Sequence, residues 1–281
     1  MNRRPAQLPP PLVLTFAASD PSGGAGMQAD LMTISSIGCH ALSVVTALTA
    51  QDTVGVGRVS AVAANCVEDQ ARRLLADMSV AAFKIGLLGS VENVAVIARV
   101  VADYPDIPLV VDPVLASGRG DELADEAMIA SLRERLMPLT TILTPNSLEA
   151  RRLARGDDGD DRQRTLAECA QRLLDFGCDH VLLTGTHDET VRVVNSLYCR
   201  GSGLVRSDAW DRLPGSYHGS GCTLASAIAA HLALGLAVED AVRVAQEYTW
   251  QSLAAGFRPG RGQFIPDRFF PTRAGSGVLD G

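Results

Sequence analysis

The chain has no run of basic residues. Its 281 residues carry a formal net charge of -7, and this balance gives no positive field that would attract a phosphate backbone. We therefore expect no nucleic-acid partner.

Paired cysteines are also missing. The six cysteines form no CxxC pair and no Cys/His spacing typical of a zinc site. A reducing compartment is the simplest location for such a chain, and we predict a cytoplasmic protein.

The chain lacks a stretch typical of a membrane span. The longest nearly apolar run, Cys222 to Val238, is interrupted by hydroxyl residues and His231 and has no flanking basic anchors, which indicates a buried helix. Residues 1–11 hold prolines where a secretory signal would need apolar residues. We expect no membrane segment and a flexible N-terminus over residues 1–11.

What the chain does contain is a series of short apolar runs that alternate with helical patterns. Hydrophobic residues make up 47% of the chain, enough for a large core. The runs are nearly continuous in apolar residues, as parallel strands covered on both faces must be. The expected strands are Leu12–Phe16, Ser43–Ala47, Ala81–Ile85, Leu109–Asp112, Thr141–Leu143 and His180–Thr184. The expected helices between them include Val67–Met78, Val91–Asp103, Asp125–Leu136 and Thr165–Phe176, with Ser90 and Asp125 as helix caps.

This alternation predicts a single α/β domain over residues 12–270. Right-handed crossovers should give a doubly wound, mostly parallel sheet with ligands at its carboxyl edge. The rhythm breaks at Thr190–Arg206, where two β-rich runs flank a glycine-containing turn, and we predict an antiparallel hairpin at one edge. Two long helices, Gly221–Leu234 and Val238–Ala255, should follow, and residues 271–281 should be flexible.

A glycine-rich segment, HGSGC from His218 to Cys222, precedes the first of these helices. Its glycines allow a tight turn at a helix start, where free N–H groups and the helix dipole can hold an anion such as a phosphoryl group. A turn that only caps the helix would have the same pattern. In the first helical turn the dipole should lower the pKa of the Cys222 thiol, although a buried helix cysteine is the structural alternative.

Three other strands end in polar residues. Residues 20–26 read DPSGGAG, Asp112 ends an apolar run, and residues 144–149 read TPNSLE. Strand ends of this kind are where an α/β sheet presents its ligand sites. In the third segment Asn146 could instead cap a helix, with Glu149 as its partner in a capping box.

Together these segments resemble the hydroxymethylpyrimidine and phosphomethylpyrimidine kinases of the ribokinase-like superfamily. HGSGCTL is similar to the family's HGTGCTL, Ala17 to Asp30 to AGxDPSGGAGxQADL, and TALTAQDT to TALxAQNT. The resemblance covers residues 12–270. It implies a ribokinase-like fold, with helices on both faces of a mostly parallel sheet and an antiparallel edge hairpin.

The resemblance also implies an activity and its residues. The enzyme would use ATP and Mg²⁺ to phosphorylate 4-amino-5-hydroxymethyl-2-methylpyrimidine, and then its monophosphate, in thiamine biosynthesis. Cys222 would be the catalytic base, beside an anion hole formed by the amides of Gly219, Ser220, Gly221 and Cys222. The pyrimidine would be bound by Asp20, Gly24, Gln51, Leu87 and Val114. The ATP phosphates would lie near Asn146, Glu149, Thr184 and Arg119, and Mg²⁺ near Asp112 and Glu149.

The chain departs from the family at two lysines. The family's KGGH begins with Thr184 here, and Gly118 occupies the lysine position of the family's AKSG. We expect Arg119 to replace the lost charge, because a guanidinium binds phosphate well. The departures leave open whether both phosphorylations occur.

Two other interpretations stay open. A pyridoxine or pyridoxal kinase of the same superfamily would act on a ring of similar shape, although Cys222 and the DPSGGAG loop favour the pyrimidine. A pyrimidine-binding regulator without catalysis would explain the missing lysines but not the joint presence of Asp112, Asn146 and Glu149 with GSGC. We expect a small-molecule substrate and a homodimer, which is frequent in resembling proteins.

Overall fold

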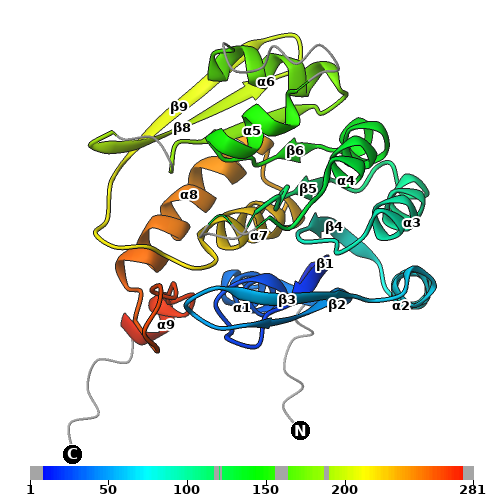
Figure 1. The fold of residues 1–281 in the computed structure, drawn as a ribbon, viewed down its shortest axis with the longest axis horizontal. Coiled ribbons are helices and arrows are strands. Elements are labelled where there is room, and N and C mark those ends of the chain that lie inside the picture. Colours follow the sequence, from blue (N-terminus) through cyan, green and yellow to red (C-terminus); the bar gives the residue numbers. More distant parts are fainter. Residues whose placement is uncertain (1–8, 117–119, 121, 156–163, 187–189, 275–281) are drawn as a thin grey trace, which may run out of the picture.

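The computed structural model describes residues 9–116, 120, 122–155, 164–186 and 190–274. Within these residues the strands form one nine-stranded sheet in the order β3-β2-β1-β4-β5-β6-β7-β8-β9 (Figure 1). The strands are β1 (Leu12–Ser19), β2 (His40–Gln51), β3 (Val56–Ala61), β4 (Val80–Ile85), β5 (Leu109–Val111), β6 (Ile142–Leu143), β7 (His180–Thr184), β8 (Arg192–Cys199) and β9 (Gly203–Asp211). Six neighbouring strands of this sheet are parallel: β2, β1, β4, β5, β6 and β7. The strands β3, β8 and β9 are antiparallel to their neighbours.

Helices cover both faces of the sheet (Figure 1). One face packs against α1 (Gly26–Ile37), α7 (Ser220–Ala233) and α8 (Val238–Ala254), and the other against α2 (Ala64–Asp77), α3 (Val91–Ala102), α4 (Glu126–Ser131), α5 (Ser147–Leu153) and α6 (Leu166–Asp175). A π-helical turn at Leu132–Leu136 and a 3₁₀ turn at Met137–Leu139 follow α4, and α9 spans Phe270–Ala274.

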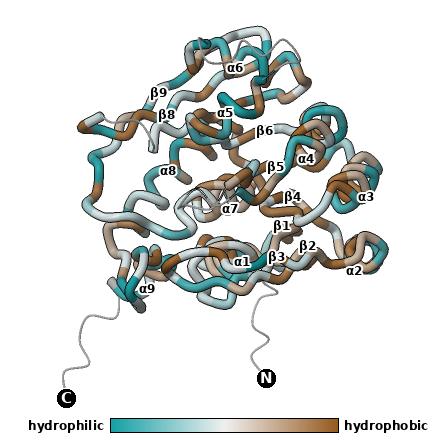
Figure 2. Tube along the Cα trace, viewed as in Figure 1, coloured by the Kyte–Doolittle hydropathy of each residue, from teal (hydrophilic) through white to brown (hydrophobic). Residues whose placement is uncertain are grey.

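The alternation of side chains along the strands divides the core in two. In β1, Leu14 and Phe16 point into the core under α2 to α6, whereas Val13 between them joins the core under α1, α7 and α8. Each central strand must therefore be apolar at nearly every position, as the sequence indicated. Figure 2 shows hydrophobic residues gathered along β4, β5 and α7.

The helix α7 is the central helix of its layer. It contacts β4, β5, α1 and α8, and every residue from Thr223 to Ala230 is buried. A helix enclosed on all sides has no polar face, which explains the apolar run Cys222 to Val238. Within the described residues, no helix is both long and apolar enough to cross a membrane.

The predicted strands, the edge hairpin and the caps at Ser90 and Asp125 are confirmed. The opposite edge was not predicted: β2 extends to Gln51 and pairs there with β3. Most residues of β3 are exposed, so it lacks the apolar pattern of a buried strand. The predicted helix Asp125–Leu136 ends as an α-helix at Ser131 and continues as the π-helical turn.

The predicted flexible ends lie largely outside the described residues. Residues 9–11 and 271–274 are described, and the latter belong to α9.

Candidate active site

The candidate site lies where the N-terminus of α7 meets the carboxyl ends of β1, β4 and β5. Asp112 directly follows β5, and a Cβ added at Gly221 would lie 3.7 Å from its Oδ1 atom. The loop of residues 20–25, which joins β1 to α1, forms one wall of the site. The sheet topology therefore brings together three segments that are far apart in the sequence.

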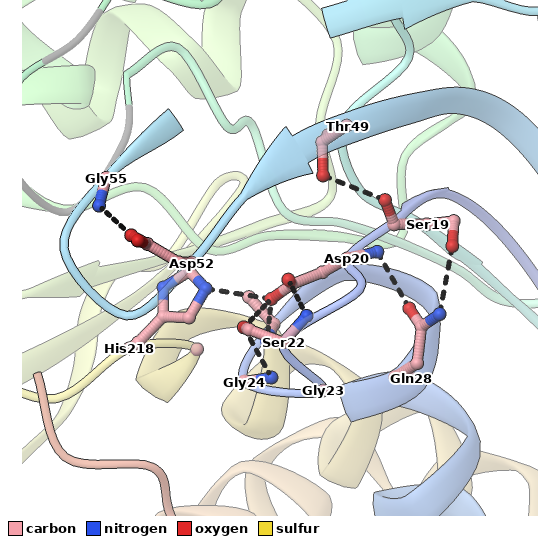
Figure 3. Close-up of polar contacts among 12 residues, drawn as sticks. Ser19, Asp20, Ser22, Gly23, Gly24, Gln28, Thr49, Asp52, Gly55 and His218 are labelled. Carbon is pink, nitrogen blue, oxygen red and sulfur yellow. Dashed lines mark hydrogen bonds and ion pairs between the residues drawn. The ribbon is translucent and has the colours of Figure 1, made fainter. Parts of the chain in front are cut away.

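The side chain of Asp20 accepts most of the hydrogen bonds that shape the 20–25 loop (Figure 3). It is buried, and its carboxylate accepts hydrogen bonds from the backbone N–H groups of Ser22 and Ala25, both at 2.8 Å, and from the Ser22 hydroxyl at 3.0 Å. Its Oδ2 atom also lies 2.8 Å from Nε2 of His218. Burial acts to raise the pKa of Asp20, but the bonds from His218, Ser22 and Ala25 outweigh it and lower the pKa to about 2. The carboxylate thus shapes the loop, and its contact with the substrate stays a prediction.

Gly24 is required by the neighbouring histidine. A Cβ at Gly24 would lie 2.3 Å from Cδ2 of His218, which is too close for any side chain. The ring of His218 therefore packs on the loop backbone while its Nε2 atom contacts Asp20. This pair joins the 20–25 loop to the residue that begins the HGSGC segment.

The HGSGC segment forms the predicted helix start. Gly219 is the N-cap of α7 with a φ of 84°, and its carbonyl accepts the first helical hydrogen bond, from the N–H of Thr223 at 2.9 Å. The N–H groups of Ser220, Gly221 and Cys222 precede that bond and have no acceptor within the helix. Three amides at the positive end of the dipole form a suitable anion hole.

A buried lysine lies under this helix start. Lys84, in β4, is fully buried, and its Nζ atom lies 2.8 and 2.9 Å from the two carboxylate oxygens of Asp30 in α1. Asp30 also accepts hydrogen bonds from the hydroxyls of Thr15 and Ser226. Burial acts to lower the pKa of Lys84, but the nearby acidic groups, Asp30 first, raise it above its usual value. Lys84 is therefore a permanent cation.

The structure corrects the prediction for the Cys222 thiol. Burial raises its pKa to about 12, although the Lys84 ammonium and the N–H of Gly26 act in the opposite direction. Loss of hydration by the thiolate outweighs the favourable field of the helix. At neutral pH Cys222 is a neutral thiol.

Asp112 is the partner of this thiol. Burial raises the pKa of Asp112 to about 6, while Lys84 and a hydrogen bond from Cys222 act to lower it. An acid with a pKa close to neutrality can accept a proton and return it. The pair of Cys222 and Asp112 is therefore a possible proton acceptor for the reaction.

Glu149 has two roles in the structure. It forms the capping box of α5 with Asn146, whose side chain accepts from the N–H of Glu149 at 2.9 Å while Glu149 accepts from the N–H of Asn146 at 3.0 Å. Burial raises the pKa of Glu149 to about 8, and the charge of Asp112 raises it further. The capping box predicted as the alternative is therefore present, and the same carboxyl group also interacts with the charge of Asp112.

Two neighbouring acids with raised pKa values form a site that a cation would stabilise. Hard oxygen ligands suit Mg²⁺, which commonly uses one or two carboxylates with water and phosphate oxygens. Asp112 and Glu149 fit that pattern. Among the described residues, no group of three or more His, Cys, Asp or Glu side chains could enclose a metal by itself.

The residues predicted to bind the pyrimidine do not form one continuous wall. Gln51, at the end of β2, lines an open cavity of about 490 Å³ together with residues 21–22, 52–54 and 259–261. Leu87 and Val114 are half-buried after β4 and β5 and do not line this cavity. Their contacts with a substrate stay predictions.

Two of the residues predicted to lie near the ATP phosphates are neighbours: Thr184, at the end of β7, forms a parallel bridge with Asn146. The N–H of Thr184 donates to the carbonyl of Pro145 at 3.0 Å. Arg119 lies outside the described residues. The predicted replacement of the missing lysine charge therefore stays a prediction.

Comparison with known proteins identifies the family. The family model described as phosphomethylpyrimidine kinase matches residues 20–267. The chain belongs to this family. It is 42% identical over 259 residues to a hydroxymethylpyrimidine/phosphomethylpyrimidine kinase of Streptomyces coelicolor, a match that covers 90% of this chain and 92% of that protein.

Solved structures agree with the assignment to the phosphomethylpyrimidine kinase family. A pyridoxal kinase from Staphylococcus aureus in complex with ADP has a TM-score of 0.83 and 28% identity, over 94% of this chain and 95% of that one. A phosphomethylpyrimidine kinase from Clostridium difficile has a TM-score of 0.73 and 33% identity, over 86% and 99%. The ribokinase-like fold and the phosphotransferase class predicted from the sequence are thereby confirmed.

Sequence reasoning missed several residues of this phosphomethylpyrimidine kinase site. Asp30 stood in a quoted motif and Lys84 in a predicted strand, but their spacing in the chain gave no sign that they pair. His218 stood in the HGSGC motif without a role. Arg268, near the C-terminus, had no signal at all.

Proposed function

We propose that this chain transfers the γ-phosphoryl group of ATP to the hydroxymethyl group of 4-amino-5-hydroxymethyl-2-methylpyrimidine, and then phosphorylates the monophosphate to the diphosphate, in thiamine biosynthesis. The observation that carries the proposal is the approach of the N-terminus of α7 to Asp112 at the end of β5, where a Cβ at Gly221 would lie 3.7 Å from the Oδ1 atom of Asp112. This geometry supports a proton acceptor beside an anion hole. Family membership supplies the substrate class.

In the first transfer the substrate O–H bond breaks, its oxygen forms a bond to the γ-phosphorus, and the bond between that phosphorus and the β–γ bridging oxygen breaks to release ADP. The amides of residues 220–222 would hold the phosphoryl oxygens. Because the thiol is protonated, Cys222 can accept the substrate proton only as it passes its own proton to Asp112. The pair, rather than the thiol alone, then acts as the general base.

Asp112 and Glu149 would hold Mg²⁺ in this scheme, and the metal would offset the charge of the ATP phosphates. The support is that burial, and then the charge of Asp112, raises the pKa of Glu149 to about 8. Bound Mg²⁺ should lower the pKa of Glu149.

A pyridoxal kinase is the second candidate. The observation in its favour is the closer backbone match to the Staphylococcus aureus pyridoxal kinase, with a TM-score of 0.83 against 0.73 for the Clostridium difficile enzyme. The higher identity to the latter favours the pyrimidine.

One assay tests both candidates. The purified chain is incubated with Mg-ATP and either the hydroxymethylpyrimidine or pyridoxal, and ADP and phosphorylated products are followed by mass spectrometry. We expect faster turnover with the pyrimidine and formation of a diphosphate. Faster turnover of pyridoxal would reverse the assignment, and binding of the pyrimidine with no ATP turnover would support a regulator without catalysis.

The homodimer and the cytoplasmic location stay predictions. The six cysteines are free thiols, in keeping with a reducing compartment. Sedimentation equilibrium of the full chain would measure the oligomeric state.

A further inference from the structure

Arg268 is a buried arginine without an acidic partner. The residue is 2% exposed, and among the described residues no carboxylate lies within ion-pair distance of its guanidinium. Two acidic side chains whose charge acts on it, Asp30 and Asp20, are already bound to Lys84 and His218. Removing a charge from water without a counter-ion is costly, so its presence here requires a compensating interaction.

The guanidinium bonds to two segments of the candidate site at once. Its Nη2 atom donates to the carbonyl of Gly24 at 2.5 Å, and Nη1 to that of Gly23 at 3.4 Å. On the other side, Nε donates to the hydroxyl of Thr223 at 3.0 Å and Nη2 reaches the carbonyl of Gly219 at 3.5 Å. The first two carbonyls belong to the 20–25 loop, and the other two acceptors to the start of α7.

These two segments are in direct backbone contact. A Cβ at Gly219 would lie 1.9 Å from the carbonyl oxygen of Gly24 and 2.8 Å from Nη2 of Arg268. The carbonyl oxygens of Gly24 and Gly219 therefore carry partial negative charge close to each other. A planar guanidinium with several donors can bind both and reduce their repulsion.

The backbone of Arg268 is held independently of its side chain. Its carbonyl accepts from the hydroxyl of Tyr248 at 2.7 Å, and the N–H of Asp267 donates to the carbonyl of Ser252 at 2.9 Å. Tyr248 and Ser252 both lie in α8. The segment after α8 is thus fixed to the scaffold and projects the guanidinium under the anion hole.

We propose that Arg268 is a positioning residue that locks the 20–25 loop against the N-terminus of α7 and supplies a buried positive charge under the anion hole. The phosphoryl group in transfer would be the counter-ion that its surroundings lack. The catalytic part of this inference rests on the proposed function. The locking of the two segments does not, and it can be measured without turnover.

The test compares Arg268→Lys and Arg268→Ala with Arg243→Ala, which removes an exposed arginine of α8 that pairs with Asp240 at 3.9 Å. Lysine keeps the charge but cannot bind several carbonyls in one plane. Amide hydrogen exchange is followed by mass spectrometry over the whole chain, and kcat and KM are measured for both substrates.

We expect both Arg268 variants to exchange faster in peptides covering residues 20–25 and 219–223, with the sheet and α8 unchanged. A displacement of about 1 Å at such a site can reduce turnover about 10²-fold, so kcat should fall to that extent, more for Arg268→Ala than for Arg268→Lys. Methylguanidine should restore part of the kcat of Arg268→Ala. Arg243→Ala should match the wild type in every measurement.

Unchanged exchange in both segments would overturn the locking role, whatever substrate the enzyme uses. Faster exchange with unchanged kcat would overturn the catalytic part. A uniform rise of exchange through the sheet would show that Arg268 is only structural. If Arg268→Ala does not fold, Arg268→Lys and Thr223→Val, which removes the acceptor of Nε, carry the same test.

Discussion

At the scale of single residues, Cys222 gives a prediction about catalysis. Its thiol is neutral and contacts Asp112, so removal of the sulfur breaks the path by which a proton could leave the substrate. We predict that Cys222→Ala lowers kcat by about 10²–10⁴-fold, the usual cost of losing a general base. The temperature of unfolding should change little, because a small side chain near a helix start leaves only a modest cavity. Steady-state kinetics with saturating substrates would measure the effect, and a full kcat would refute the role.

Asp20 gives a prediction about pH. Its pKa is lowered to about 2 from an ordinary value of 3.8, so its ionised form stabilises the folded chain. This stabilisation is complete above about pH 4 and is lost as the pH falls toward 2, and a shift of this size corresponds to about 2 kcal/mol. Asp20→Asn should lack this part of the pH dependence. Urea unfolding of both proteins between pH 5 and pH 2 measures it, and parallel curves would show that Asp20 does not contribute.

At the scale of elements, α5 and α6 offer a matched pair of capping boxes. Glu149 caps α5 at the site, whereas Glu168 caps α6 with Thr165 away from it. Glu149→Gln and Glu168→Gln should both reduce stability, by no more than about 1 kcal/mol. We predict that only Glu149→Gln raises the KM for Mg-ATP and shifts the Mg²⁺ dependence of the rate.

The comparison separates the two roles of Glu149. Initial rates at varied Mg²⁺ and ATP give the kinetic effect, and thermal unfolding gives the structural one. If the two variants lose similar stability and neither changes the ATP kinetics, Glu149 is only a helix cap.

The elements also show how far the sequence predicts the fold. Strands such as β7 and helices such as α3 have a buried face, and their apolar spacing therefore defines them. The strand β3 is mostly exposed and owes its existence to pairing with β2, so only the tertiary structure shows it. An element can be predicted from the sequence where its own apolar spacing marks a buried face. It cannot be predicted where the element forms only because it pairs with another segment.

The same contrast holds in the site. The helix start at HGSGC could be predicted because it depends on the backbone of that segment itself. The raised pKa of Cys222 could not, because burial by other segments causes it. The role of Arg268 also depends on a contact between residues more than two hundred positions apart.

At the scale of the whole molecule, the pair of Lys84 and Asp30 links four elements. Lys84 lies in β4 and Asp30 in α1, and Asp30 is also bound by Thr15 of β1 and Ser226 of α7. All four side chains are fully buried. Separation of this cluster should therefore require opening of both the sheet and its helix layer.

Lys84 is also the only lysine in the sequence, which makes this opening measurable. An amine-specific acylating reagent can label only the N-terminal amine and Lys84, and the N-terminal amine serves as an internal control for reagent activity. We predict that Lys84 is labelled only through global unfolding, since the most protected parts of a protein open with the full unfolding free energy. The labelling rate of Lys84 should then rise with urea as steeply as the unfolding equilibrium itself. Asp30→Asn should raise the rate at every urea concentration, because it removes the charge that holds the ammonium. Rapid labelling of Lys84 in native buffer, or a rate that responds only weakly to urea, would show that the site opens locally and that this cluster does not hold the four elements together.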